Sequence, residues 1–201
     1  AARQEVIRRY FRYACEHAMG FTPEATVDRC KLLMDELDLD PLQRRVVGPA
    51  REAGEDGRRR GKGNKGMFCG AAAELADGTI VTGTNSPLMH AASSLVLNAI
   101  KHLAGIPDNL HLLAPQVLES IARMKDDILA SKSVSLDLEE ALIALSVSAS
   151  TNPTAQMGLD KLADLSDGQR RHVLAGGVDR ECEGYAGVTA MTLFGLLARE
   201  Y

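Results

Sequence analysis

AAAELADGTIVTGTNSPLMHAASSLVLNAIKHLAG, residues 71–105, is the stretch that decides the fold of this chain. Two strands are expected at residues 68–75 and 79–84, joined at Asp77-Gly78, where glycine tolerates the positive φ of a tight hairpin turn. A long buried helix follows, with the Ser86-Pro87 pair as its cap and first position. The stretch therefore predicts a hairpin that leads directly into a helix.

Length and composition bound the class of protein. The chain has 201 residues, enough for one domain with an appendage and a substantial core. Apolar residues make up 45% and charged residues 25%, as in ordinary globular proteins, whereas aromatic residues are only 4%, so the core must be aliphatic. The net charge of -4 creates no field that favours nucleic acid or an anionic membrane, and neither is expected as a partner.

Targeting and cysteine signals predict a cytoplasmic protein. No apolar run approaches the roughly 20 residues that a membrane-spanning helix needs, and no signal-peptide pattern is present. A helical pattern begins directly at Ala1, so we interpret the chain as a fragment with material missing on its N-terminal side. The cysteines lie far apart without a CxxC pair, as expected of reduced thiols: Cys15, Cys30, Cys69 and Cys182.

The N-terminal part of the chain predicts a series of helices. Apolar residues recur at helical spacing up to Gly20, and Thr22-Pro23 then restarts a helix with Thr as its cap. Asp40-Pro41 repeats this device for a short third helix that reaches about Glu52. We interpret residues 1–53 as a helical subdomain appended to the rest of the chain.

A basic, glycine-rich segment, GEDGRRRGKGNKG at residues 54–66, marks the predicted boundary after this subdomain. We interpret it as a mobile, solvated linker loop. The alternative is a phosphate cradle made of glycine backbone and basic side chains. The segment lacks the GxxxxGK[ST] spacing of a P-loop and no strand precedes it, so the linker is the favoured interpretation.

Residues 67–201 predict an α/β subdomain in which helices alternate with short strands. Asp137 followed by Glu140 forms a capping pattern, and Asn152-Pro153 caps a further helix. The chain as a whole predicts the α/β class, with an N-terminal helical appendage and a layered α/β/α domain that has a mixed sheet. The elements expected after the first helix are a strand at 110–113, a helix from Pro115 to about 130, a loop at 132–136, helices at 141–150 and from 153 to about 165, and closing strands at 171–175 and 188–193.

The order of a hairpin and then a helix resembles the cytidine-deaminase-like topology, in which zinc activates a water molecule. His90-Ala91-Ala92 stands where the first zinc motif is expected, but the acidic proton shuttle is absent. The second helix start, residues 150–154, contains no cysteine. A lone histidine cannot hold a catalytic zinc, which needs three protein ligands. The sequence therefore predicts no metal, no cofactor and no zinc deaminase activity.

Two polar helix starts remain as candidate binding sites. Each presents backbone N–H groups with hydroxyl and amide groups, which suit a phosphate or a carboxylate. Simple capping also explains either start, and a helix histidine is commonly satisfied by a backbone carbonyl. If the two starts converge they form a site for a small anionic ligand, and a separation beyond about 15 Å excludes that site. The candidate residues are Thr84, Asn85, Ser86 and His90 in the first start, and Thr151, Asn152 and Thr154 in the second.

Several segments together resemble the C-terminal half of a bacterial family known as domain of unknown function 1846. The resemblance covers nearly the whole chain, is strongest from Ala71 to Leu165 and is looser after Ser166. The segments that carry it are RQEVIRRYFRYACE at 3–16, ADGTIVTGTNS at 76–86, NAIKHLAGIPD at 98–108 and LIALSVSASTNPTAQMGLDKL at 142–162.

This resemblance implies a cytosolic bacterial protein longer than the chain, whose absent N-terminal half resembles a nucleotide-binding unit with a glycine-rich phosphate loop. It also implies a helical subdomain followed by an α/β subdomain of deaminase-like topology, and it supplies no catalytic residues. We expect a non-catalytic module that packs against that missing N-terminal half and supports a homo-oligomer. The alternative is that the chain contributes part of an active or binding site for a nucleotide-like or phosphorylated small metabolite.

Overall fold

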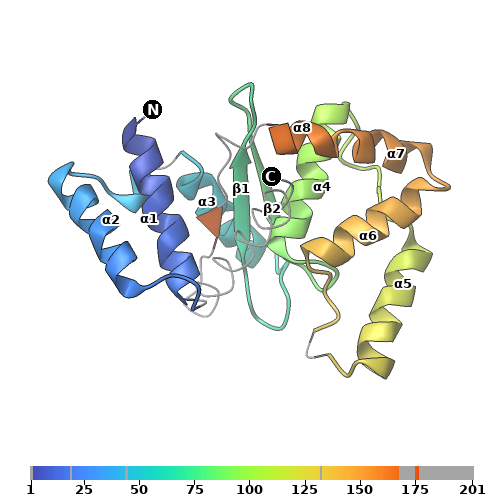
Figure 1. Ribbon diagram of the computed structural model, residues 1–201. Coiled ribbons are helices and arrows are strands. Elements are labelled where there is room, and N and C mark those ends of the chain that lie inside the picture. The colour runs from blue at the N-terminus through green and yellow to red at the C-terminus, as the bar shows by residue number, and fades with distance from the viewer. Residues whose placement is uncertain (1, 19, 44, 132, 168–174, 177–201) are drawn as a thin grey trace.

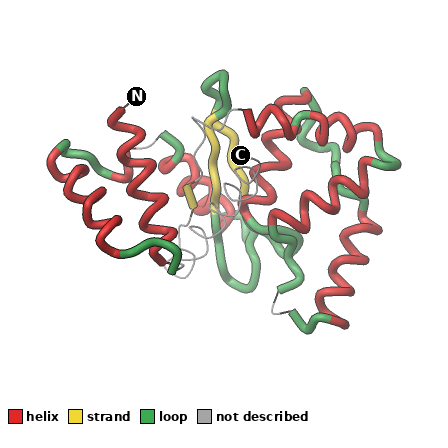
Figure 2. Tube along the Cα trace, in the orientation of Figure 1, coloured by secondary structure: helices red, strands yellow, loops and turns green. Residues whose placement is uncertain are grey.

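The computed structural model describes residues 2–18, 20–43, 45–131, 133–167 and 175–176, and it places a small sheet between two groups of helices (Figures 1 and 2). In Figure 1, α1 and α2 lie to one side of the strands, and α4 to α8 lie to the other. The elements are α1 Ala2–Ala18, α2 Glu24–Glu36, the 3₁₀ turn η1 Pro41–Gln43, α3 Val47–Arg59, β1 Gly70–Glu74, β2 Ile80–Thr84, α4 Ala91–Ala104, α5 Pro115–Arg123, the π-helical turn η2 Met124–Ile128, α6 Leu138–Ala149, α7 Pro153–Asp160, α8 Leu162–Asp167 and β3 Ala175–Gly176.

The predicted hairpin is confirmed. β1 and β2 pair antiparallel, with Gly70 opposite Thr84, and Gly78 at the turn has a φ of 87° that a residue with a side chain rarely adopts. The order of the described strands is β2-β1-β3, and β3 is also antiparallel to β1. Because the parallel pairing within the described residues is an isolated bridge between Met89 and Leu136, the prediction of a mixed sheet was wrong for this part of the chain.

The two faces of the β1–β2 hairpin pack mainly against different helices, α3 and α4. Ala72 packs in one cluster with Ala50 of α3, whereas its neighbours Ala71 and Ala73 pack with Leu95 of α4. This alternation follows from the two-residue period of a strand, which sends successive side chains to opposite faces. The predicted α/β/α layering is therefore present, with α3 and α4 as the outer layers.

Both helices approach the strands closely because glycine lies at each crossing. A Cβ atom added to Gly70 would stand 2.0 Å from the Ala50 carbonyl oxygen of α3. On the opposite face, a Cβ on Gly83 would stand 2.2 Å from the Leu95 nitrogen of α4. Backbone therefore meets backbone at both crossings, and neither Gly70 nor Gly83 has room for a side chain.

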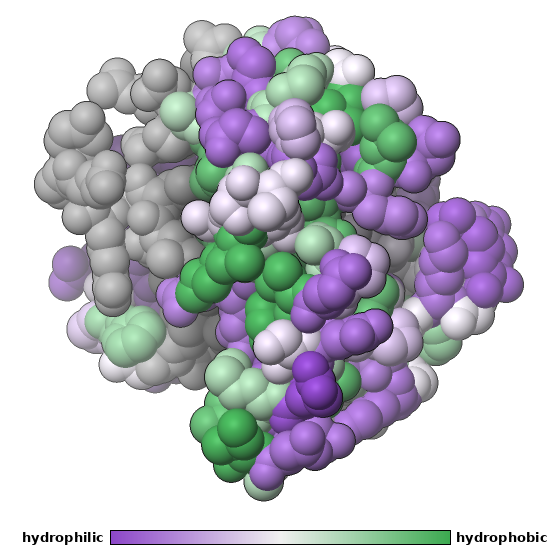
Figure 3. Space-filling model, turned by 90° about the vertical axis from the view of Figure 1, so that its right-hand side faces the viewer, coloured by the Kyte–Doolittle hydropathy of each residue, from purple (hydrophilic) through white to green (hydrophobic). Residues whose placement is uncertain are grey.

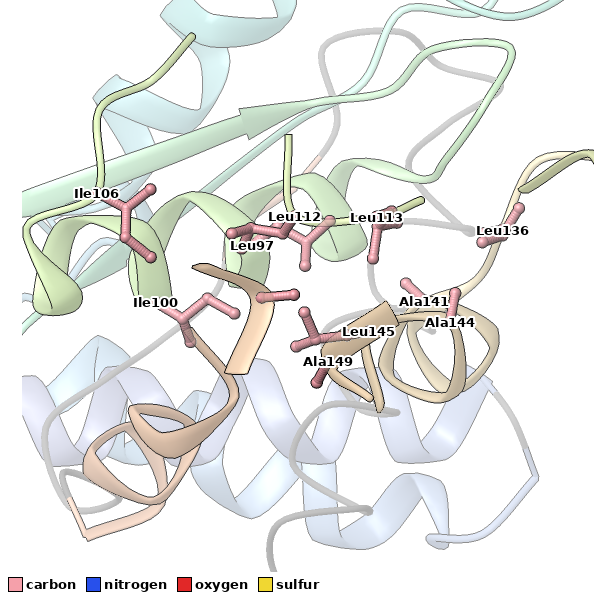
Figure 4. Close-up of a cluster of buried hydrophobic side chains, with 11 residues drawn as sticks. Leu97, Ile100, Ile106, Leu112, Leu113, Leu136, Ala141, Ala144, Leu145 and Ala149 are labelled. Carbon is pink, nitrogen blue, oxygen red and sulfur yellow. The ribbon is translucent and has the colours of Figure 1, made fainter. Parts of the chain in front are cut away.

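A second packing region lies between α4 and the C-terminal helices (Figure 4). It is aliphatic, as the composition predicts, and Leu97 and Ile100 of α4 meet Leu145 of α6 there. The strand expected at residues 110–113 was wrong. These residues form turns and bends in which Leu112 and Leu113 both enter this cluster, while the next N–H, at Ala114, donates to the Ser148 hydroxyl at 2.9 Å rather than to a strand.

The linker predicted at residues 54–66 was also wrong in its first half, because residues 54–59 belong to α3. Gly54 and Gly57 are buried in that helix, and a Cβ on Gly57 would stand 3.7 Å from the Thr84 methyl group. The two glycines therefore serve close packing against the hairpin rather than chain flexibility. α3 also runs across the predicted subdomain boundary at residue 53 and packs on the sheet, while the division into subdomains stays a prediction.

Two of the predicted helix caps are confirmed and another was wrong. The capping box of α6 is confirmed, with Asp137 and Glu140 each accepting the other's backbone N–H, and Asn152 caps α7 as expected. Thr22 does not cap α2, because its hydroxyl donates to Glu16 instead. Of the two closing strands, Ala175 lies in β3, whereas residues 171–174 and 188–193 lie outside the described residues.

We predict that Gly70→Ala and Gly83→Ala each lower the free energy of unfolding by about 3 kcal/mol, because a new methyl group must push strand and helix apart. Urea denaturation of the purified protein measures this. Gly48→Ala in α3 is the matched control, since a Cβ there meets nothing within 4 Å, and we expect it to be neutral or slightly stabilising. Equal losses from all three variants would contradict the close-approach argument.

Candidate functional site

The first predicted helix start is a structural corner that precedes α4. The helix was expected to begin at Ser86-Pro87, but it begins at Ala91 with His90 as its N-cap. The Ser86 hydroxyl instead accepts the N–H groups of Leu88 and Met89, each at 3.2 Å, and forms a turn. Ser86 therefore makes the side-chain hydrogen bonds expected of a helix cap, but they stabilise a turn rather than the start of a helix.

Asn85 is buried, with 8% of its surface exposed, and both polar atoms of its side-chain amide bond to backbone groups. Its Oδ1 accepts the Cys69 N–H at 2.8 Å, and its Nδ2 donates to the Met67 carbonyl at 3.0 Å. These bonds hold the segment before β1 beside the end of β2. Thr84 lies on the α3 side of the hairpin, next to Gly57. Asn85 therefore ties two segments together, and its amide is committed to protein groups.

Ser135 joins this corner to the loop before α6. Its hydroxyl lies 3.1 Å from the Ser86 carbonyl and 2.9 Å from the Pro87 carbonyl, to which it donates, and it accepts from Asn64 Nδ2 at 2.9 Å. The adjacent Leu136 accepts the His90 N–H at 2.9 Å and donates to the Leu88 carbonyl at 2.9 Å. Three segments far apart in the sequence therefore meet at one buried hydroxyl.

A partly buried ion pair between Lys125 and Glu140 lies next to Ser135. Lys125, on the π-helical turn, is 7% exposed and donates to the Ser135 carbonyl at 2.7 Å and to Glu140 Oε2 at 2.6 Å. The same Glu140 oxygen accepts the Asp137 N–H at 2.9 Å as part of the α6 capping box. Buried charges need such pairing, and the ion pair fixes η2 against the start of α6.

The His90 side chain lies within the electrostatic reach of this ion pair. Burial lowers the pKa of His90 below its ordinary value of 6.5, and the Lys125 charge adds to that lowering. Asp137 and Glu140 oppose it by raising the pKa. The bond to a backbone carbonyl was expected from the imidazole, whereas the bond that the structure shows is made by the backbone N–H of His90, to Leu136. The imidazole is therefore mainly neutral at physiological pH.

The two predicted helix starts do not converge. Asn152 follows the C-terminal end of α6, where its N–H donates to the Ser148 carbonyl, and its Oδ1 caps α7 at Thr154 N–H. The first start meets the N-terminal end of α6, through His90 and Leu136. The 12 residues of α6 separate these ends by about 18 Å. Figure 1 shows α6 running from the foot of α4 to the start of α7. One small ligand cannot bridge the pair, and binding at either start by itself stays a prediction.

Three residues of this region were not predicted from the sequence: Asn64, Lys125 and Ser135. A signal for Lys125 was present, because it follows Ile121 by four residues and so continues the apolar, inward-facing side of that helix. No pattern pointed to Asn64 or Ser135, whose partners lie far along the chain. In the described part of the chain, no group of three or more His, Cys, Asp or Glu side chains lies close enough to hold a metal ion.

These features define an α/β protein whose polar corner is a structural joint. The chain matches the family model described as Domain of unknown function DUF1846, C-terminal, over residues 42–175. It is 45% identical over 163 residues to a UPF0371 protein of Clostridium botulinum strain Alaska E43, which is 81% of this chain and 32% of that protein. It is 48% identical over 164 residues to a UPF0371 protein of Clostridioides difficile strain 630, with the same two coverages.

The chain therefore belongs to the DUF1846 family, and the predicted family resemblance is confirmed. It spans about a third of the length of these curated relatives. Of the helices in the described ranges, none has both the length and the apolar character that a membrane crossing requires.

We predict that Lys125→Met lowers the free energy of unfolding by about 2 kcal/mol, because it leaves the Ser135 carbonyl and the Glu140 carboxylate without their cation. Chemical denaturation monitored by circular dichroism measures this. Lys161→Met removes a solvent-exposed pair with Asp164 and is the control, for which we expect no measurable change. A Lys125→Met protein as stable as the wild type would show that the ion pair does not hold the joint.

We also predict that His90 makes folding sensitive to acid. Because its pKa is lower in the folded than in the unfolded state, the folded state is fully favoured above the unfolded value of 6.5 and loses stability as the pH falls below it. Unfolding measured from about pH 7.5 to about pH 5.5 should show this loss, and His90→Gln should reduce it. An NMR titration that places the folded His90 pKa above 6.5 would contradict the assignment.

Proposed function

We propose that this chain is a non-catalytic packing module of a longer protein. The outer face of α6 is the observation that carries this proposal. Ile143 and Val147 lie one helical turn apart there and are 61% and 50% exposed, and Met157 of α7 is 52% exposed. The opposite side of α6 is already buried against α4, through Ala141 and Leu145 among others.

A helix that is apolar on both sides is normally covered on both sides. Large apolar side chains exposed on neighbouring helices are typical of surfaces that bind other protein. Figure 3 looks onto the side of the molecule that carries α5, α6 and α7, where hydrophobic residues are exposed in several places, one of them near the middle, among hydrophilic ones. We call the exposed apolar residues Ile143 and Val147 of α6, together with Met157 of the adjacent α7, the α6 outer face.

The proposed occupant of the α6 outer face is the remaining, N-terminal part of the same longer protein. The relatives are about three times the length covered here, and the matching family model describes a C-terminal domain, which supports an internal partner. A second copy of the chain is the alternative occupant and would give the homo-oligomer expected from the sequence. We keep the nucleotide-binding-like character of the N-terminal half as part of the proposal, on the family resemblance alone.

We also propose a deaminase-like topology for the α/β part of the chain and a cytoplasmic location for the protein. The hairpin followed by α4 on one of its faces supports a deaminase-like topology. The wide spacing of the cysteines supports a cytoplasmic location.

The test is the double variant Ile143→Glu with Val147→Glu in the native full-length protein. Two charges placed in a buried apolar interface are strongly unfavourable, whereas two charges on a solvated face cost little. We therefore expect a fall of several degrees in the unfolding temperature. Gln116→Glu on α5, an exposed polar position, is the control and should leave that temperature unchanged.

Light scattering on the same proteins distinguishes the occupants. Destabilisation at constant molar mass supports the internal partner, and dissociation into smaller species assigns the face to a second copy. An unchanged unfolding temperature together with an unchanged mass would rule out the packing function.

A further inference from the structure

Basic residues are concentrated at the end of α3 and directly after it. Residues 55–65 contain five cations and two carboxylates, a net charge of +3, so the remaining residues carry -7. Arg59 and Arg60 share Asp56, and the side chains of Arg59, Arg60, Lys62 and Lys65 are all exposed to solvent. We call residues 58–66 the basic turn.

The basic turn has a defined backbone. α3 ends with Gly61 at a φ of 64°, where the Lys62 N–H returns to the Gly57 carbonyl at 2.8 Å. Asn64 and Met67 then exchange two backbone hydrogen bonds of 3.0 and 3.1 Å across Lys65 and Gly66. Those two residues have φ values of 52° and 82°, which is the geometry of a two-residue type I′ hairpin turn. Lys65 is therefore held at a tip.

Side chains also fix the basic turn to the rest of the molecule. Asn64 Nδ2 donates to Ser135 Oγ at 2.9 Å and lies 3.4 Å from Ser133 Oγ. The Arg58 guanidinium lies 5.6 Å from the centre of the Phe68 ring. A cationic segment that is already ordered loses little conformational entropy when it binds a partner.

A hydroxyl donor lies beside the basic turn. Ser133 Oγ accepts from Asn64 and from the Ser135 N–H, and its own proton has no acceptor within the described residues. It is half-buried, next to the anchor of the turn. A hydroxyl proton with this position can be donated to an oxygen of a bound anion.

We propose that the basic turn binds the phosphate group of a small molecule, with Lys62 and Lys65 as cationic contacts and the Ser133 hydroxyl as a hydrogen-bond donor. A single carboxylate gains little from exposed lysines, whereas a phosphate presents more charge and three oxygens to several donors. A nucleic acid is disfavoured, because its larger footprint would bring further phosphates against a surface that is net acidic. This inference is independent of the packing function and depends on a different surface.

The test uses inorganic pyrophosphate as the probe, titrated into the native full-length protein by calorimetry. The variant is Lys62→Gln with Lys65→Asn, since asparagine tolerates the left-handed backbone at that position. We expect its affinity for pyrophosphate to fall by about tenfold or more, and the wild-type affinity to weaken as salt is added. Ser133→Ala should lower the affinity several-fold, and Lys31→Gln on α2 is the control.

Unfolding temperatures of all variants show whether the fold is kept, and the Ser133→Ala protein provides a second readout if the lysine variant is unstable. Affinity losses confined to the lysine and serine variants would support the proposal. No binding of pyrophosphate, an equal loss with Lys31→Gln, or tighter binding of a single-stranded oligonucleotide than of pyrophosphate would each overturn it.

Discussion

The direct contact of backbone with backbone on both faces of the β1–β2 hairpin is the constraint on which the rest of the structure depends. Gly70 admits α3 on one face and Gly83 admits α4 on the other. Because α4 starts where β2 has just ended, this close approach leaves a short connecting segment that must turn sharply. We call that segment, residues 85–90, the polar corner. Its path depends on how closely α3 and α4 approach the hairpin, which the absence of side chains at Gly70 and Gly83 allows.

At the polar corner, backbone and side-chain polar groups from distant parts of the chain hydrogen-bond to one another. The Ser135 hydroxyl donates to the turn before α4 and accepts from Asn64 of the basic turn. Lys125 donates to the Ser135 carbonyl and so fixes the loop before α6. Both polar atoms of the Asn85 side chain also bond to backbone groups. Binding of other molecules is therefore more plausible at the exposed surfaces of the protein than at the polar corner. The α6 outer face is apolar and lies on a helix that packs against α4. The basic turn is cationic and is tied to Ser135 through Asn64.

The sequence predicts those features whose partners lie close along the chain. The Asp77-Gly78 turn, the Asp137–Glu140 capping box and the Asn152 cap involve residues at most a few positions apart, and all three were correct. The start of α4 was wrong because Ser86 makes the local bonds of a cap while its geometry is set by Ser135, 49 residues away. The end of α3 was wrong because Gly54 and Gly57 are read as helix breakers, although burial against the sheet compensates a helix penalty of about 1 kcal/mol each.

Hydroxyl-radical footprinting of the native full-length protein tests the central claim most directly, because it reports whether solvent reaches individual side chains. In the chain described here, Met157, Ile143 and Val147 are each at least half exposed. If this chain is a packing module, their oxidation in the native protein should be strongly slowed relative to the denatured protein. Oxidation of all three at the rates expected for half-exposed side chains would contradict the account.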